Sequence, residues 1–230
     1  MKTKINSELD FPYEVIRTNR KKSASIKVLH GKVQFIIPKH LSQKRLELLI
    51  QKKTPWVIKK LHDLSQVEPV KPKEYVNGEC FTYLGRNYRL RLDNKESNKL
   101  KLTGGKFVLG DENTEFVRNS LIEWYLYHAK ERLEEKTYRY AKLIGVNPKS
   151  VKVKSYKSRW GSCSVHGDIT YNWKIIIAPH RIVDYVVVHE LCHLLHHNHS
   201  GKFWKSVECV IPEWNECRTW LRDFGNTLVV

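Results

Sequence analysis

The clearest chemistry in this chain is carried by the HExxH sequence at residues 189–193. Residues four apart on a helix lie one turn above each other, so His189 and His193 can offer two imidazole nitrogens to one metal ion. Glu190 points along the same cleft. The apolar run at residues 182–188 predicts that this helix is buried. A buried imidazole pair beside a carboxylate favours a bound divalent cation, which compensates the cost of desolvation.

A catalytic zinc ion usually has three protein ligands and one water, so the motif requires a third ligand. His196 shares the helix face, but on a straight helix a ligand two turns beyond His189 lies about 10 Å away, too far for one ion. His199 reaches the ion only if the chain turns back, and Asn198 tolerates such a turn. We therefore favour His199 as the third ligand and interpret His196 and His197 as neighbouring or surface residues.

Glu190 is the natural general base of such a site. The fourth position on the metal holds water, whose pKa zinc lowers toward about 7. Glu190 would take a proton from this water, direct the hydroxide at a carbonyl or phosphoryl centre, and return the proton to the leaving group. The chemistry predicted from the motif is therefore hydrolysis.

Further motifs occur in a fixed order around the histidines: Arg159-Trp160-Gly161-Ser162-Cys163-Ser164, Asp168-Ile169-Thr170-Tyr171-Asn172-Trp173, Ala178-Pro179 and Phe203-Trp204. Over about the last 80 residues the chain resembles the YgjP-like zinc metallopeptidases, relatives of the SprT-like and WLM peptidases. The resemblance implies that His189, His193 and His199 bind Zn2+ and that Glu190 is the catalytic base. It does not settle the substrate: a protein or peptide is expected because such proteins are generally called metallopeptidases by their motif.

Three functions remain open at this stage. The leading prediction is a zinc-dependent metallopeptidase. A second is a metal-dependent nucleoside triphosphate (UTP) pyrophosphatase, because some members of the family are described so, and Arg159 is then the nearest phosphate contact by sequence. A third is a DNA-associated SprT-like protease or binding module. For any of them, Arg159, Trp160, Tyr171 and Asn172 are the residues that could line the substrate cleft, since a strand beside the active helix can pair with an extended substrate. Core packing is the alternative for Trp160.

Composition limits the class of protein. The chain has 230 residues, 41% of them hydrophobic, enough to bury a core. Its five cysteines are odd in number and do not form a disulfide framework. No leader-like apolar segment and no run of about 18 apolar residues is present, so we expect a cytoplasmic protein that does not span a membrane.

Positive charge is concentrated in the first half of the chain. Residues 1–110 contain 24 Lys and Arg against 10 Asp and Glu, whereas residues 111–230 contain 17 against 14. Such a surface could bind phosphates of nucleic acid or of a nucleotide, or could simply be solvated.

The pattern of elements predicts an α+β protein. Residues 1–110 read as a basic β-rich N-terminal region with an antiparallel sheet over 13–37, short helices at 42–51 and 54–64, and hairpins over 81–92 and 100–109. A turn is expected at His30-Gly31 and a connector over 65–74.

Residues 111–230 read as a zincin-like metal-binding catalytic domain. A long helix should run from Asp111 to Gly145, with His128 on its core face in a packing role or beside the metal ligands. A β-hairpin of residues 151–156 and 169–177 should pack on the HExxH helix. Helices at 203–209 and 214–224 should cover that helix.

Overall fold

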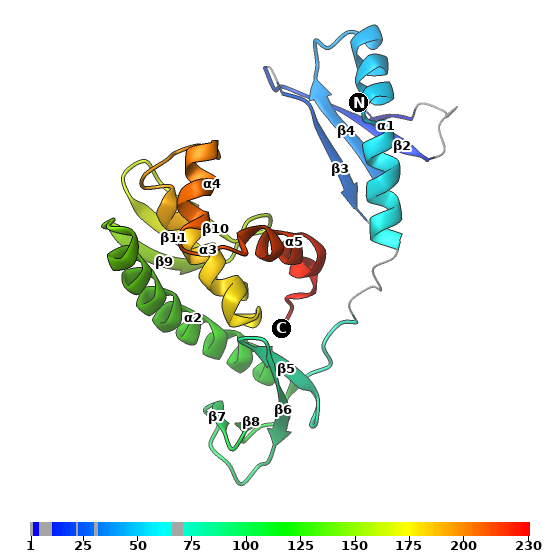
Figure 1. Ribbon diagram of the computed structural model, residues 1–230. Helices are drawn as coiled ribbons and strands as arrows, with labels where there is room; N and C mark the ends of the chain where they lie inside the picture. Colours follow the sequence, from blue (N-terminus) through cyan, green and yellow to red (C-terminus); the bar gives the residue numbers. More distant parts are fainter. Residues whose placement is uncertain (1, 5–10, 22, 30–31, 66–70) are drawn as a thin grey trace. The chain divides into compact units, whose positions relative to one another are not determined.

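The computed structural model of the chain describes residues 2–4, 11–21, 23–29, 32–65 and 71–230 (Figure 1). The chain divides into two compact units, Met1–Lys71 and Pro72–Val230. Each unit has a hydrophobic cluster of its own. The turn expected at His30-Gly31 and residues 66–70 of the expected connector lie outside the described residues.

The first unit contains a mixed four-stranded sheet, not the antiparallel sheet expected. Its elements are β1 (Lys2–Lys4), β2 (Tyr13–Thr18), β3 (Ser25–Leu29), β4 (Lys32–Pro38) and α1 (Gln43–Ser65). The strand order is β1-β2-β4-β3. Strand β4 lies between β2, to which it is parallel, and β3, to which it is antiparallel. This inner position explains why most of β4 is buried, which an alternating surface strand would not be.

The two short helices expected after this sheet form one helix, α1, with Pro55 inside it. Pro55 lacks the N–H that would bond to the carbonyl of Gln51, and Gln51 is exposed, so water can satisfy that carbonyl. Ile50 and Val57, one on each side of the proline, are both buried in the core of this unit. The apolar face therefore continues through the proline, and packing outweighs the local break.

The second unit begins with a sheet of two hairpins, at the places predicted. Its strands are β5 (Cys80–Tyr83), β6 (Arg86–Leu92), β7 (Lys101–Thr103) and β8 (Lys106–Leu109), in the order β5-β6-β8-β7. Helix α2 (Thr114–Ile144) packs on this sheet through Trp124, whose ring centroid lies 4.8 Å from Phe107 and 4.9 Å from Tyr83. This shared core is the reason why the chain does not divide at residue 110 as expected.

Helix α2 begins and ends where local chemistry predicts. The side chain of Asn113 accepts a hydrogen bond from the Phe116 amide, and Gly145 takes the left-handed conformation (φ 79°) that closes a helix C-terminus. Lys136 of α2 donates a hydrogen bond to Asp184 of the next long helix at 2.6 Å, and this ion pair is largely buried. It joins the helix that supports the site to the helix that carries it.

A three-stranded sheet lies between these two helices in sequence: β9 (Ser150–Lys154), β10 (Gly161–Cys163) and β11 (Asp168–Asn172). The hairpin expected between 151–156 and 169–177 is wrong, because β9 and β11 are parallel and β10 is the antiparallel partner of β11. The strand also stops earlier. The Asn172 side chain accepts from the Lys174 amide and starts a short 3-10 helix, η1 (Trp173–Ile177).

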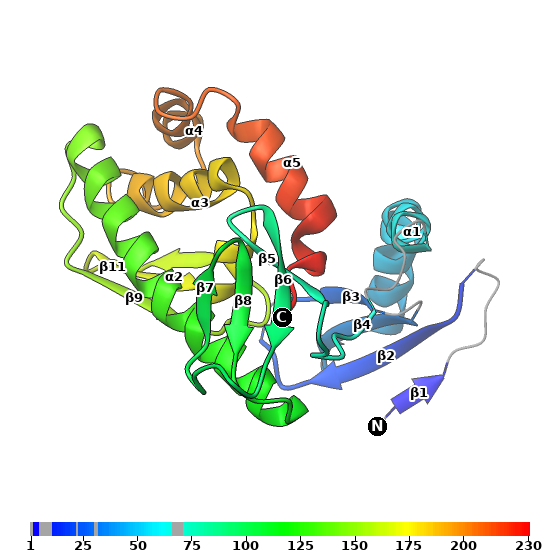
Figure 2. The same cartoon turned by 90° about the horizontal axis from the view of Figure 1, so that it is seen from below.

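The HExxH helix, α3 (His180–Cys192), is the centre of the second unit. Most of its residues are buried, and it contacts α2, α5 and the strand β10. Figures 1 and 2 show α3 between α2 on one side and α5 (Trp214–Phe224) on the other. The remaining elements are α4 (Gly201–Glu208) and η2 (Gly225–Thr227). Within the described residues, no helix is both long and apolar enough to span a membrane.

Candidate metal centre

Three histidines converge at the end of α3. One side-chain nitrogen from each of His189, His193 and His199 lies within 4.8 Å of the others. The closest approach is 3.1 Å, between Nε2 of His189 and Nε2 of His199. Two ligands of a tetrahedral zinc ion with bonds of about 2.05 Å are separated by about 3.3 Å. The spacing of this pair therefore suits two ligands of a single ion.

The turn that returns His199 to the helix begins earlier than expected. The turn was expected at residues 197–198, but α3 already ends at Cys192, and His193 is its C-cap. The amides of Leu195 and His196 both donate to the Cys192 carbonyl, which tightens the chain into a turn. This early exit gives the chain room to fold back within a few residues.

His193 is oriented by the same turn. Its Nδ1 lies 3.1 Å from the backbone oxygen of His196. Since a carbonyl only accepts, Nδ1 must carry the proton, and in the neutral ring Nε2 then holds a lone pair. The ring of His196 in turn reaches Ser206 of α4, with Nε2 3.2 Å from its Oγ. His196 thus supports His193 through its backbone, while its ring points to a different partner.

The surroundings of His189 keep its ring neutral. Burial lowers the pKa of His189 to about 3, with further lowering from His193 and His199. Its Nδ1 is buried and has no hydrogen-bond partner among the described residues. Phe203 and Trp204 of α4 pack against the ring, with centroids at 5.0 and 5.8 Å. A neutral imidazole in an apolar wall is what a metal ligand requires, so these residues fit a divalent cation.

Glu190 follows His189 on α3, and its side chain lies against the backbone of β10. Its side chain is buried, and burial raises its pKa to about 8, while Arg159 acts in the opposite direction. A methyl group added to Gly161 would lie 2.5 Å from Glu190 Oε1. The strand can approach this carboxylate only because residue 161 has no side chain. Sequence reasoning missed Gly161, although an isolated glycine in a strand is a known signal of close approach.

The loop before β10 forms the wall of a cavity of about 290 Å³. Arg159, Trp160 and Asn172 line it, although Glu190 and the three histidines do not, and Lys157 and Lys174, which sequence reasoning missed, add positive charge. No carboxylate is among its lining residues. The Asn172 amide donates to the carbonyls of Tyr156 and Arg159 at 3.1 and 3.2 Å, and so holds the loop in place. The cavity is therefore suited to a negatively charged group.

Tyr171 does not lie where it was expected. It cannot line a cleft, because its ring is fully buried and its hydroxyl lies 3.0 Å from Thr137 Oγ1 of α2. Alternation along β11 turns it into the core.

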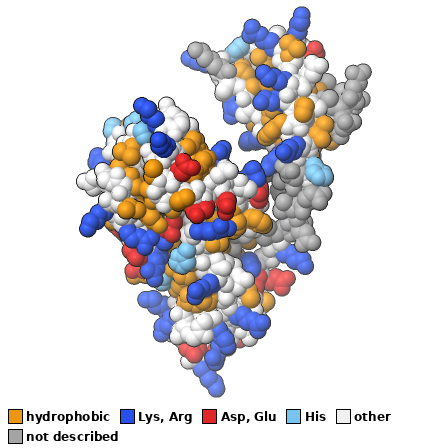
Figure 3. All heavy atoms as spheres, in the orientation of Figure 1, with side chains coloured by type: hydrophobic (Ala, Val, Ile, Leu, Met, Phe, Trp, Pro, Cys, Tyr) orange, Lys and Arg blue, Asp and Glu red, His pale blue; other side chains and the backbone are white. Residues whose placement is uncertain are grey.

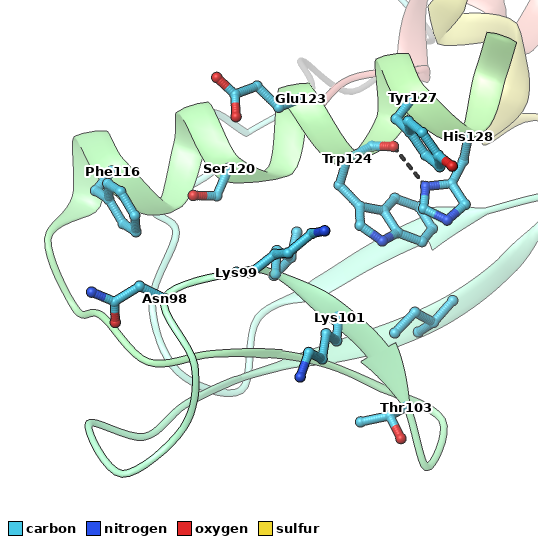
Figure 4. A pocket seen from close by; sticks show the side chains of 12 residues that line it. Asn98, Lys99, Lys101, Thr103, Phe116, Ser120, Glu123, Trp124, Tyr127 and His128 are labelled. Atoms are coloured by element: carbon cyan, nitrogen blue, oxygen red, sulfur yellow. Dashed lines mark hydrogen bonds between the residues drawn. The ribbon is translucent and has the colours of Figure 1, made fainter.

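His128 has a packing role, which was one of the two alternatives expected for it. It stacks on Trp124 at 3.8 Å between ring centroids, its Nδ1 lies 2.8 Å from the Trp124 carbonyl oxygen, and it lines a different cavity (Figure 4).

Comparison with known proteins identifies one matching family and two similar structures. The sequence model of a family described as YgjP-like, metallopeptidase domain, matches residues 22–224. No curated protein matches the chain. The zymogen of the metallopeptidase abylysin from Pyrococcus abyssi is 24% identical, with a TM-score of 0.36, over 39% of this chain and 93% of its own. The zymogen of jannalysin from Methanocaldococcus jannaschii is 19% identical, with a TM-score of 0.37, over 42% and 97%.

Proposed function

Because this chain belongs to the YgjP-like metallopeptidase family, we propose that it is a zinc-dependent peptidase that uses Glu190 as its general base. The proposed zinc ligands are His189, His193 and His199. The observation that carries the proposal is the convergence of these three rings at the end of the helix that also carries the buried carboxylate of Glu190. A set of three imidazoles with a remaining position for water is typical of catalytic zinc, and that donor set is the reason for choosing zinc among divalent cations.

The chemistry follows from where the chain holds its groups. A cation bound by the three rings would supply Lewis-acid activation of water and would stabilise negative charge on the substrate. An Oε atom of Glu190 would accept the proton of the attacking water and pass it to the leaving amine. Gly161 lets β10 lie directly against that carboxylate, because the strand has no side chain at this position. Phe203 and Trp204 form an apolar wall against the ring of His189.

We further propose that Arg159 and Trp160 contact the substrate, while Asn172 acts by holding their loop. The cavity formed by this loop is lined by Lys157, Arg159 and Lys174 without a compensating carboxylate. An acidic side chain or a terminal carboxylate of a peptide would complement this charge. Tyr171 has no part in the proposal.

The ligand assignment is tested by the zinc content of purified variants. We expect a single zinc ion per chain in the wild type and its loss in His199→Ala, because two imidazoles alone hold zinc weakly. His197→Ala is the matched control, since His197 is exposed and is next but one to the ligand. Zinc retained in His199→Ala but lost in His197→Ala or His196→Ala would overturn the assignment.

A second candidate, hydrolysis of a nucleoside triphosphate such as UTP to release pyrophosphate, is favoured by the same basic cavity. Phosphates would take the place of the peptide carboxylate beside Arg159. Pyrophosphate release and peptide cleavage should therefore be measured on the same zinc-loaded sample. Release of pyrophosphate that disappears in Arg159→Gln, without any peptide cleavage, would replace the peptidase proposal.

Association with DNA rests only on charge. Figure 3 shows basic side chains scattered over the visible face of each unit, without a continuous band. The family match names no nucleic-acid partner. We therefore do not extend the proposal to DNA.

A further inference from the structure

A groove in the second unit is lined by none of the three histidines. It measures about 700 Å³ and runs between residues 98–103 and one face of α2. Figure 4 shows Phe116, Ser120 and Trp124 pointing from the helix toward this segment, with Lys99 extending into the space between. One wall is thus a strand and the other a helix.

The strand wall, β7, is the edge of its sheet. Its hairpin to β8 has a two-residue loop, Gly104-Gly105, and both glycines have positive φ (54° and 71°), as a type I′ turn requires. In such a hairpin the flanking residues Thr103 and Lys106 form a hydrogen-bonded pair, so the next pair, Leu102 and Phe107, does not. The N–H and C=O of Leu102 therefore point away from β8, toward the open edge.

No recorded backbone hydrogen bond joins that open edge to another segment of the described chain. An edge strand that presents free backbone groups is a template for one more strand. Native proteins usually cover or shorten such an edge, and β7 is short but is not covered. The groove beside it provides space for an added chain.

Side chains on the two walls define what an added strand would need. Residues 100–103 all line the groove: Leu102 is half-buried and Leu100 is buried, whereas Lys101 and Thr103, which alternate with them, are exposed. On the helix wall, Phe116 is 38% and Tyr127 61% exposed, which is high for aromatic side chains. An incoming strand would therefore place apolar residues toward the helix.

The positive charge around β7 determines which side chains suit the other face of the incoming strand. Lys99 precedes β7, Lys101 is its first residue, and Lys106 follows the turn. No acidic residue lies between Lys99 and Lys106. Opposite charges across neighbouring strands are stabilising, whereas like charges are not. Glu123, the only carboxylate of the lining, lies on the upper side of the helix in Figure 4, at the rim.

We propose that this groove binds an extended peptide segment in which acidic and apolar residues alternate, and that the segment adds to β7 as a further strand. Its apolar side chains pack against Leu102 and Phe116, and its acidic side chains pair with Lys99 and Lys101. The binding does not depend on the metal site, so it can be measured whether or not the protein is a peptidase. For a peptidase, such a groove would hold a protein substrate at a distance from the cleaved bond.

The test is binding of a fluorescent ten-residue peptide that alternates Glu with Ile and Phe, followed by fluorescence polarisation. Leu102→Pro removes the outward N–H but no bond to β8, since proline is tolerated at a strand edge in that orientation. We expect its affinity to fall about tenfold. Leu102→Val is the matched comparison: it also changes the side chain but keeps the N–H, so it should lose much less affinity than Leu102→Pro. The double variant Lys99→Glu, Lys101→Glu should weaken binding by a similar factor.

Two further measurements identify the mode of binding. The amide of Leu102 should exchange its hydrogen more slowly when the peptide is bound, because it gains a partner. A peptide with Lys in place of Glu should bind much more weakly. Equal affinity in the wild type, Leu102→Pro and the charge variant would overturn the proposal. So would absence of binding to the acidic peptide, or binding only to a single-stranded oligonucleotide.

Discussion

At the scale of single residues, the site depends on the absence of a side chain at Gly161 as much as on its proposed ligands. His189 and His193 can be predicted as a pair from spacing, because a helix fixes which residues share a face, whereas His199 lies beyond the helix and requires a turn. The cleft residues are harder to predict. Tyr171 and Asn172 are neighbours in sequence, yet one is buried against α2 and the other holds the loop of Arg159. Which face of a strand meets the cleft is decided by tertiary packing.

Gly161 offers a direct test of how Glu190 is positioned. Gly161→Ala would place a methyl group 2.5 Å from Glu190 Oε1, so the carboxylate must move. We expect activity to fall about 100-fold with zinc content unchanged, because a displacement of about 1 Å is enough for such a loss. Gly201→Ala is the matched control, since its added methyl group meets nothing within 4 Å. Equal activity of the two variants would show that Glu190 is not held by β10.

At the scale of elements, the long helices and hairpins follow local rules, whereas strand pairing does not. Caps at Asn113 and Gly145 delimit α2 as the sequence predicts. The parallel pairing of β9 with β11 could not be predicted, because alternation gives the faces of a strand but not its partner. The continuity of α1 through Pro55 is likewise a result of burial on both sides of the proline.

The ion pair between α2 and α3 gives a prediction about stability. Lys136 and Asp184 lie 2.6 Å apart and are only 10% and 17% exposed, so Lys136→Met leaves a largely buried carboxylate. We expect the free energy of unfolding to fall by about 2 kcal/mol. Arg139→Met is the control: Arg139 reaches the same carboxylate at 3.6 Å but is 58% exposed, and its loss should cost less than about 1 kcal/mol. Urea unfolding of both variants measures the difference, and equal costs would contradict it.

At the scale of the whole molecule, the sequence predicted a division between a basic first part and a catalytic second part, but not its position. Residues 80–109 are rich in strands and basic side chains, and by composition they resemble what precedes them. In the fold they belong to the second unit, because Phe81, Phe107 and Tyr83 share a core with α2. Composition does not report which surface a strand is packed on.

The two units should therefore be separable by function. All three proposed ligands, Glu190 and the basic cavity belong to Pro72–Val230. A fragment of residues 72–230 contains a complete hydrophobic cluster, so we expect it to fold cooperatively and to bind a single zinc ion as the full chain does. Circular dichroism on heating and zinc analysis test this. A fragment that unfolds without cooperativity would show that the first unit is required for folding.

The most direct test of the central claim is cleavage of an unfolded protein by zinc-loaded wild type and by Glu190→Gln, followed by mass spectrometry of the products. The substitution keeps the size of the side chain but removes its ability to accept a proton. We predict that both proteins bind the same amount of zinc, that the wild type cleaves, and that cleavage by the variant is at least about 1000-fold slower. Equal cleavage by both proteins, or none by a zinc-loaded wild type, would contradict the assignment of this site as a peptidase centre.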